Sequence, residues 1–417
     1  MRASAFLYPW DVVGDPYAPG RLAALGADRV TLAAAYHSTR ALTPRHPRHR
    51  VVTAEHAAVL YPPGPRWTGR ALRPLPSGDW APGDAYGTAA EALAGAGLEV
   101  HTWVVLAHNS RLGADHPDTS VVNAHGDRYP WAPCVAQPAV RALLTDLAAE
   151  AAVRPGAAGS ELESLGWYGL AHLHAHDKTG GVALDEAARF LMDLCFCPAC
   201  RDGYGGLGQD PDALAAAVRA ALEPVWRGLP PEDGGWADVE KRLGADRAAA
   251  ALAWRTETAR TLQEAAVAAV RAAAPAGFRV LLHADPVPFH TGANAGVDPA
   301  HILSVADGVV VPCADGPALL TPFATVRRPD TVLAANLSVV SGMGGSPATL
   351  ARDAARARAH GATELRLYHA GLASDADLTA VREGLATLRS GDPGDVAAEA
   401  GAREAGAAGA GAAGPGG

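Results

Sequence analysis

Four short apolar runs in the second half of the chain decide the fold: FRVLLHAD (Phe278–Asp285), GVVVPC (Gly308–Cys313), TVLAANL (Thr331–Leu337) and ELRLYHA (Glu364–Ala370). Between the last two runs, Pro347–His360 has a helical composition. Continuous apolar runs of this length are typical of strands that are buried on both faces of a parallel sheet. This half of the chain therefore predicts strands that alternate with helices.

The first half repeats the pattern. We expect strands at Ser4–Tyr8, Arg29–Ala35, Glu99–Ala107 and Leu162–Gly166, and helices near Arg21–Leu25 and over Pro138–Ala152. Eight strands alternating with helices favour a closed (β/α)8 barrel, the TIM barrel, over an open doubly wound sheet. No glycine-rich nucleotide loop follows the first strand, which also disfavours an open-sheet cofactor enzyme.

Composition limits the domain organisation. We expect one barrel domain over residues 1–390, with a long loop at 38–84 over the barrel mouth and a helical insertion at about 183–274. Residues 391–417 are rich in Ala and Gly and are expected to be a disordered tail, because they cannot bury apolar area.

Charge and cysteine content limit the partners and the compartment. The net charge of −9 argues against nucleic acid or an anionic membrane as the main partner. No apolar run approaches the ~20 residues of a membrane span. The N-terminus does not resemble a secretory signal, and the five cysteines do not resemble a disulfide framework. We therefore expect a cytoplasmic protein.

Polar and aromatic residues gather where the predicted strands end, which is where barrel active sites lie. Aromatic rings stack on sugars, and His, Asn and Asp bond to hydroxyl groups, so the pattern predicts a small-molecule carbohydrate as substrate. The candidate substrate-binding residues are Tyr8, Trp10, Tyr36, His37, His108, Asn109, Trp167, His172, His174, His176, His283, Asn336, Tyr368 and His369.

Two carboxylates across a cleft are the usual apparatus of glycosidic cleavage. Glu163 is the candidate acid, because burial beside Leu162, Leu165 and Trp167 would raise its pKa, and Glu161 on the same strand face is the fallback. Asp285 is the candidate second carboxylate, ahead of Asp11 and Asp315. The alternative for Glu163 is a structural carboxylate that binds backbone groups.

Two clusters could hold a metal. His172, His174 and His176 alternate and precede Asp177; they could bind a catalytic ion, although hydrogen bonds to substrate are the favoured interpretation. Cys195, Cys197 and Cys200 could converge on a structural zinc ion completed by Cys134, and the alternative is four small buried side chains.

CFCPACRDGYGG (Cys195–Gly206) resembles the zinc-binding segment of the family 42 β-galactosidases, which belong to clan A of the glycoside hydrolases. Gly126–Glu150 resembles the segment of that family in which a cysteine precedes the fourth strand. The resemblance implies zinc ligands at Cys134, Cys195, Cys197 and Cys200, and an acid/base glutamate at Glu163.

Residues 1–390 also resemble a group of uncharacterised bacterial TIM-barrel proteins of glycoside hydrolase type. Three stretches carry this likeness: AAAYHSTRALTPRHPRHRV (33–51), ELESLGWYGLAHLHAHDK (161–178) and CFCPACR (195–201).

The chain departs from the family 42 pattern at both catalytic positions. Leu162 precedes Glu163 where that family has Asn, and the seventh strand carries Asn336 and no carboxylate where the family has its nucleophile. Three functions follow as alternatives. They are a glycoside hydrolase, a barrel that only binds a saccharide or another metabolite, and a metal-dependent hydrolase that uses His172, His174 and His176.

Overall fold

Eight parallel strands close into a barrel in the computed structural model, which describes residues 1–170, 177–229 and 234–390. The last strand pairs with the first, with Arg2 opposite Glu364, and the first also pairs with the second, with Ser4 opposite Arg29. The predicted (β/α)8 barrel is therefore confirmed. The barrel strands are β1 (Arg2–Leu7), β2 (Arg29–Tyr36), β7 (Glu99–Val105), β10 (Ala157–Glu163), β11 (Arg279–Asp285), β13 (Gly308–Pro312), β14 (Val332–Ser338) and β15 (Glu364–Tyr368).

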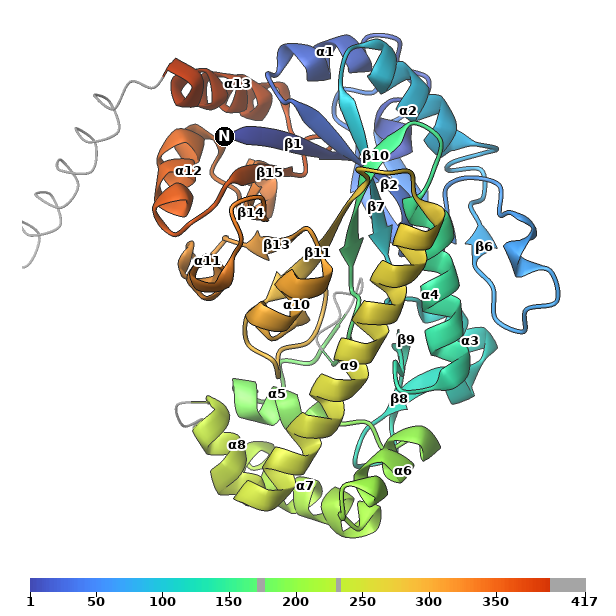
Figure 1. The fold of residues 1–417 in the computed structure, drawn as a ribbon, viewed down its shortest axis with the longest axis vertical. Helices are drawn as coiled ribbons and strands as arrows, with labels where there is room; N and C mark the ends of the chain where they lie inside the picture. Colours follow the sequence, from blue (N-terminus) through green and yellow to red (C-terminus); the bar gives the residue numbers. More distant parts are fainter. Residues whose placement is uncertain (171–176, 230–233, 391–417) are drawn as a thin grey trace, which may run out of the picture.

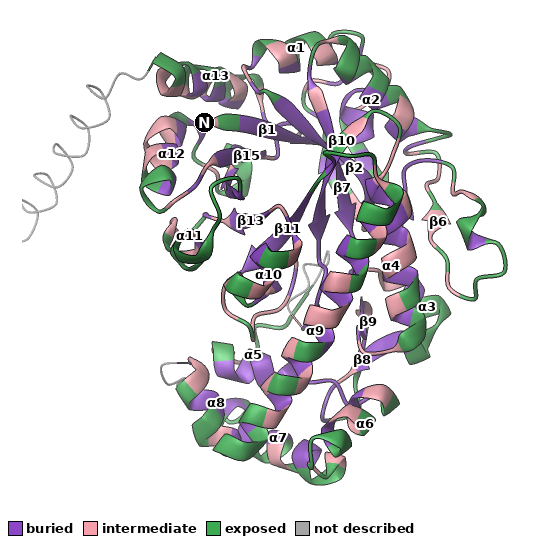
Figure 2. Ribbon diagram, in the orientation of Figure 1, coloured by how far each residue is buried: buried purple, intermediate pink, exposed green. Residues whose placement is uncertain are grey.

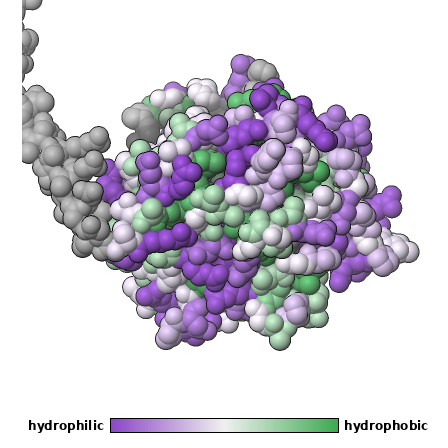
Figure 3. All heavy atoms as spheres, turned by 90° about the horizontal axis from the view of Figure 1, so that it is seen from above, coloured by the Kyte–Doolittle hydropathy of each residue, from purple (hydrophilic) through white to green (hydrophobic). Residues whose placement is uncertain are grey.

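Helices surround the strands, and Figure 1 shows them as an outer ring. Figure 2 shows the strands buried, while the helices expose their outer sides. On the face seen in Figure 3, hydrophilic residues surround small groups of hydrophobic ones. The ring consists of α1 (Ala18–Ala24), α2 (Ala85–Gly95), α4 (Pro138–Ala152), α9 (Ala245–Ala273), α10 (Pro299–Val305), α11 (Thr321–Val326), α12 (Leu350–Ala359) and α13 (Asp375–Ser390).

The prediction of the fourth strand at Leu162–Gly166 was wrong by several residues. The strand runs from Ala157 to Glu163, because this segment pairs with Val100–Val105 on one side and with Arg279–Leu282 on the other. Ser164 has a left-handed φ of 55°, which ends the strand. Glu163 is thus the last strand residue, and Glu161 shares its side of the strand.

The segment 38–84 carries short strands of its own. They are the antiparallel pair β3 (Thr39–Leu42) and β4 (Val51–Ala54), followed by β5 (Ala58–Val59) beside β2 and by β6 (Leu75–Pro76). Between β3 and β4, the Arg45 guanidinium donates to the carbonyl groups of Ala370 and Ala373. These bonds hold the β3–β4 connection against the loop that follows β15, at the carboxyl end of the barrel.

Two insertions extend the barrel. After β7 come α3 (Ser110–Asp115) and the antiparallel strands β8 (Ser120–Val122) and β9 (Arg128–Pro133); β12 (Ala295–Gly296) adds to β11. After β10 come α5 (Glu186–Met192), α6 (Pro198–Gly206), α7 (Pro211–Trp226) and α8 (Trp236–Leu243), which group at one end of the molecule and lead into the 29-residue α9 (Figure 1).

The helices in the described part of the chain lack the combined length and apolar character that crossing a membrane requires. His172, His174 and His176 and the expected tail at 391–417 lie outside the described residues.

Candidate active site and cysteine cluster

Glu163 is a buried carboxyl group at the carboxyl end of β10, with only 8% of its surface exposed. Its Oε2 accepts a hydrogen bond from Nε1 of Trp103 on β7 at 2.7 Å. Burial raises the pKa of Glu163, against the opposing effects of His283 and of the Trp103 hydrogen bond. A raised pKa favours the protonated form of Glu163, which is the form that can donate a proton to a substrate.

The expected neighbours of Glu163 differ from the observed ones. Leu162, Leu165 and Trp167 belong to the apolar core that contains the helices, whereas Trp103 belongs to a separate cluster with Phe6 and Tyr8. The reason is the strand alternation, which sends Leu162 and Glu163 to opposite sides of β10. The predicted burial is present, but Trp103 and His283 are the residues in contact with the carboxyl group.

Glu161 is fully buried one step deeper in the barrel and is part of an ion pair. Its Oε1 lies 2.5 Å from Nε of Arg366 and accepts a hydrogen bond from Thr31 at 3.3 Å. Burial opposes ionisation, but the Arg366 charge lowers the pKa of Glu161 to about 2. Glu161 is therefore an ionised structural carboxylate and is poorly suited to donate a proton.

An aromatic cluster closes the barrel above these carboxyl groups. Tyr8 stacks on Trp10 at 4.5 Å and on His369 at 4.3 Å, and Tyr36 meets Trp103 edge-on at 4.6 Å. Burial raises the pKa of Tyr368 to about 12, so its hydroxyl group stays protonated. These residues lie on or directly after β1, β2, β7 and β15, and five of the predicted strand-end residues are thus neighbours: Tyr8, Trp10, Tyr36, Tyr368 and His369.

A row of stacked rings continues from this cluster. Tyr36 stacks on His37 at 4.2 Å, His37 lies 4.3 Å from His108, and His108 stacks on Tyr168 at 4.2 Å. Tyr36, His108 and Tyr168 are buried, so this row lies inside the protein, and His37 alone among the four rings is partly exposed.

Three predicted site residues form hydrogen bonds or ion pairs with residues outside the aromatic cluster. Trp167 donates from Nε1 to the carbonyl of Arg255 on α9 at 3.0 Å, and Asn109 accepts from the amide of Leu112 at the start of α3 at 2.9 Å. Asp285 lies 3.0 Å from Nδ1 of His290. Trp167 thus packs toward the helices, and Asn109 caps one of them.

Two further carboxylates at strand ends were weaker candidates. Asp11 is buried, and its Oδ2 accepts from the amide of Tyr8 at 2.8 Å; burial raises the pKa of Asp11 to about 7. Asp315 is exposed after β13.

Asp315 lines a cavity of about 410 Å³ at the carboxyl ends of β13 and β14. In the described part of the chain, two buried atoms of β14, Oδ1 of Asn336 and Oγ of Ser338, have no hydrogen-bond partner. Unpaired polar atoms near a barrel rim can bind hydroxyl groups of a ligand. Polar residues in the cavity wall include Asp315, Ser338, Ser346, Arg352, Asp353 and Arg356.

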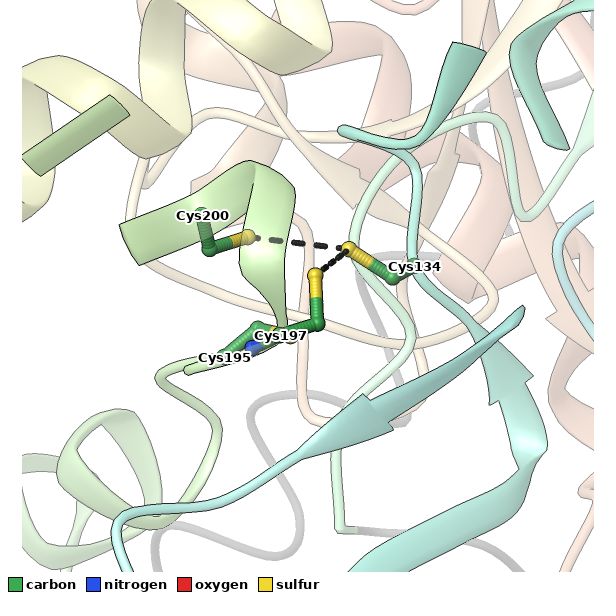
Figure 4. A group of neighbouring side chains, drawn as sticks. All are labelled: Cys134, Cys195, Cys197 and Cys200. Carbon is green, nitrogen blue, oxygen red and sulfur yellow. Dashed lines mark hydrogen bonds between the residues drawn. The ribbon is translucent and has the colours of Figure 1, made fainter. Parts of the chain in front are cut away.

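The four cysteines of the predicted zinc site lie together (Figure 4). Cys134 follows β9, Cys195 and Cys197 precede α6, and Cys200 lies in its first turn. The sulfur atoms are buried and lie within 4.8 Å of one another, with Cys134 Sγ 3.5 Å from Cys197 Sγ and 3.6 Å from Cys200 Sγ.

Four converging thiols fit a tetrahedral zinc ion, which takes sulfur ligands at about 2.3 Å. The amide groups of Val122 and Cys197 each point at Sγ of Cys195 at 3.4 Å, which would orient and stabilise a thiolate there. Among the residues that the structure describes, no other group of three or more His, Cys, Asp or Glu side chains could hold an ion.

The sequence prediction missed Trp103, Arg29 and Arg366, all of them buried in the barrel. A signal was present, since Arg366 and Glu364 alternate with leucines in ELRLYHA, and charges at every second position of a buried strand point to the barrel interior. For Trp103 the sequence shows only a tryptophan, with its single indole N–H group, within an apolar strand, and this does not indicate a contact with Glu163.

Searches with protein-family models and with curated proteins give no match. Solved structures do resemble the chain. They include the alpha-L-fucosidase isoenzyme 2 from Paenibacillus thiaminolyticus (TM-score 0.57, 11% identity, 93% of this chain and 49% of that one) and the beta-galactosidase from Rahnella sp. R3 (TM-score 0.54, 11% identity, 94% and 56%). The catalytic domain of beta-amylase from Paenibacillus polymyxa matches over 94% of this chain and 99% of its own, with a TM-score of 0.53 and 13% identity.

The chain spans about half the length of the fucosidase and the β-galactosidase. At these identities the likeness concerns the fold. These structural neighbours are glycoside hydrolase barrels, and the chain shares their fold.

Proposed function

We propose that the protein is a glycoside hydrolase that acts on a carbohydrate or glycoconjugate, with Glu163 as the proton donor. The observation that carries the proposal is the environment of Glu163: a buried carboxyl group with a raised pKa, hydrogen-bonded to Trp103, at the carboxyl end of a barrel strand. Protonation of the glycosidic oxygen by such a group is the first requirement of glycoside cleavage.

Asp285 is the proposed second carboxylate. It lies at the end of β11, beside β10, and its Oδ1 accepts from the amide of Val287 at 2.8 Å while Oδ2 contacts His290. These contacts would orient the carboxylate toward one side of a bound sugar, where it could attack the anomeric carbon or activate water. The cavity at the carboxyl ends of β13 and β14 would hold a sugar ring.

The test is a screen of glycosides with the purified protein, followed by Glu163→Gln. We expect this variant to lose at least about 10²-fold in turnover while its melting temperature and sugar binding stay unchanged. Asp285→Asn should also lose turnover. Glu257→Gln, on the exposed side of α9, is the matched control and should keep the wild-type rate. Full activity in Glu163→Gln would refute the assignment.

A second candidate function is a barrel that binds a saccharide or another metabolite without cleaving it. Asn336 on β14 favours this function, because no carboxylate is present on that strand. A broad screen without turnover, together with a sugar-dependent rise in melting temperature, would support it over hydrolysis.

A third candidate, a metal-dependent hydrolase, depends on His172, His174 and His176. A second equivalent of bound metal that is lost when these histidines are replaced would support it.

We also propose that Cys134, Cys195, Cys197 and Cys200 hold a structural zinc ion. The ion would join the loop after β9 to the start of α6 and so fix the insertion to the barrel. The site requires reduced thiols, which agrees with the expected cytoplasmic location.

A further inference from the structure

A cavity of about 410 Å³ opens at the carboxyl ends of β13 and β14, on the rim of the barrel. Its walls are the loop after β13 (313–317), the end of β14, the loop at 344–346 and the first turns of α12. The connection between β14 and α12 contains the sequence SGMGGS over residues 341–346. The cavity is thus bounded by two strand ends, a glycine-rich loop and one helix.

The glycines let this loop lie directly against the end of β14. A Cβ atom on Gly345 would be 2.6 Å from the carbonyl oxygen of Ser338 and 2.7 Å from its Oγ, and Gly344 has a left-handed φ of 76°. A larger residue at Gly345 would push the loop away from the strand. The loop therefore contributes backbone groups and the small polar side chain of Ser346 to the wall.

Two arginines of α12 line the cavity one helical turn apart. Nε of Arg352 lies 3.2 Å from Oδ1 of Asp353, while its two terminal nitrogens have no partner among the described residues. Arg356 is exposed and has neither an ion pair nor a side-chain hydrogen bond in the same part of the chain. The wall therefore carries guanidinium N–H groups that are available to a ligand.

The acidic residues of the wall differ in their contacts. Both oxygens of Asp353 are engaged, one by Oγ1 of Thr349 at 2.5 Å and the other by Arg352. Asp315 is exposed and is the one carboxylate of the wall without a partner among residues 1–170, 177–229 and 234–390. Oγ of Ser338 is buried, has no partner there and can donate. The available groups of the wall are therefore mainly hydrogen-bond donors.

An oxyanion fits such a wall, because it only accepts hydrogen bonds and because the guanidinium fork matches the oxygens of a carboxylate or a phosphate. We infer that this cavity binds an oxyanion, the carboxylate or phosphate group of an acidic sugar, through Arg352 and Arg356. That the ligand is a sugar rests on the proposed function, whereas the oxyanion rests on the cavity itself. Asp315 repels the same group and so lowers the affinity for it.

The test is a calorimetric titration of the full chain at low salt with inorganic phosphate, glucuronate, glucose 6-phosphate and glucose. We expect phosphate and at least one of the two acidic sugars to bind with a Kd of about 1 mM or tighter, and glucose to bind at least about tenfold more weakly. Glucuronate and glucose 6-phosphate distinguish a carboxylate from a phosphate ester as the recognised group. No binding of phosphate, no binding of either acidic sugar, or equal binding of glucose would overturn the inference.

Variants locate the anion. Arg352→Met combined with Arg356→Met should lower the affinity for phosphate at least about tenfold, because charge-assisted hydrogen bonds to both guanidinium groups are lost. Arg358→Met is the matched control and should bind as the wild type does, since Arg358 is exposed on the same helix and does not line the cavity. Asp315→Asn should raise the affinity by about two- to fivefold, because one exposed negative charge is removed. A lower affinity in Asp315→Asn, or an equal loss in Arg358→Met, would overturn the assignment.

These titrations need no turnover, so the two proposals can fail separately. A failed glycoside screen with a protein that binds the anions would count against the proposed function alone. An enzyme that cleaves neutral glycosides but binds none of the anions would count against the oxyanion site alone.

Discussion

Trp103 on β7 donates its indole hydrogen to Oε2 of Glu163 on β10 across 2.7 Å, although the residue opposite Trp103 in the strand pairing is Glu161. The long indole ring therefore reaches two residues further toward the mouth. Because an indole nitrogen can only donate, it anchors this carboxyl oxygen in both protonation states of Glu163.

Trp103→Phe should raise the pKa of Glu163, because the hydrogen bond that is lost favours the ionised form. Once a substrate is known, the alkaline limb of the pH–rate profile should move to higher pH and the rate at the optimum should fall. Unfolding should become easier by about 1–3 kcal/mol. Trp167→Phe, which also loses a buried indole hydrogen bond, is the control for stability. An alkaline limb that moves equally in both variants would contradict the prediction.

Asp11 should make the protein less stable as pH rises. Burial raises its pKa from 3.8 to about 7, so its contribution to stability is fully present below pH 3.8 and is lost as pH rises through 7. That difference corresponds to at most roughly 4 kcal/mol. Asp11→Asn should therefore match the wild type in denaturant unfolding at pH 4 and exceed it at pH 8.

Asp377→Asn is the control with the opposite sign. Burial opposes ionisation of Asp377, but hydrogen bonds from Ser341 and Ser374 lower its pKa. Its contribution is present above the unfolded pKa and is lost as pH falls, so the variant should be less stable than the wild type at pH 8. A gain of stability in both variants at pH 8 would show that charge burial is not the cause.

The eight strands were predictable because each is a short apolar run buried on both faces, and seven of the eight predicted segments overlap the observed strands with small shifts at their ends. The fourth was misplaced because Ala157–Ser160 contains only small residues, so the sequence gives little apolar signal where the strand begins. Pairing with β7 and β11, which the sequence does not display, determines that boundary.

The candidate site was predictable in part. Glu163 and the strand-end aromatics follow from the rule that barrel sites lie at the carboxyl ends of strands. The contacts of Glu163 do not, because Trp103 and His283 lie 60 and 120 residues away along the chain and are brought together only by barrel closure. The cysteine cluster was predictable from its spacing, whereas Arg45 and the β3–β4 pair were not.

Cys197→Ser should release the proposed zinc ion. We expect one equivalent of zinc in the wild type by elemental analysis and much less than one in the variant, with a fall in melting temperature of several degrees, because metal binding energy contributes to folding. Cys313→Ser, a buried cysteine outside the cluster, should retain the metal. A full equivalent in Cys197→Ser would mean that the ion binds elsewhere.

Arg366→Met should be among the most destabilising single changes in the barrel, because it leaves the buried carboxylate of Glu161 without its counter-charge. We expect a loss of about 3–5 kcal/mol in the free energy of unfolding at pH 7. The pKa of Glu161 is about 2 in the folded state, so its contribution is present above its ordinary pKa and is lost as pH falls toward 2; the cost of the variant should shrink over the same range. Arg111→Met breaks the exposed pair with Asp115 and should cost less than about 1 kcal/mol. Adding Glu161→Gln to Arg366→Met should recover most of the lost stability, because the buried carboxylate that lacks a partner is then removed. A double variant as unstable as Arg366→Met alone would show that the packing of Arg366, and not its charge, stabilises the barrel.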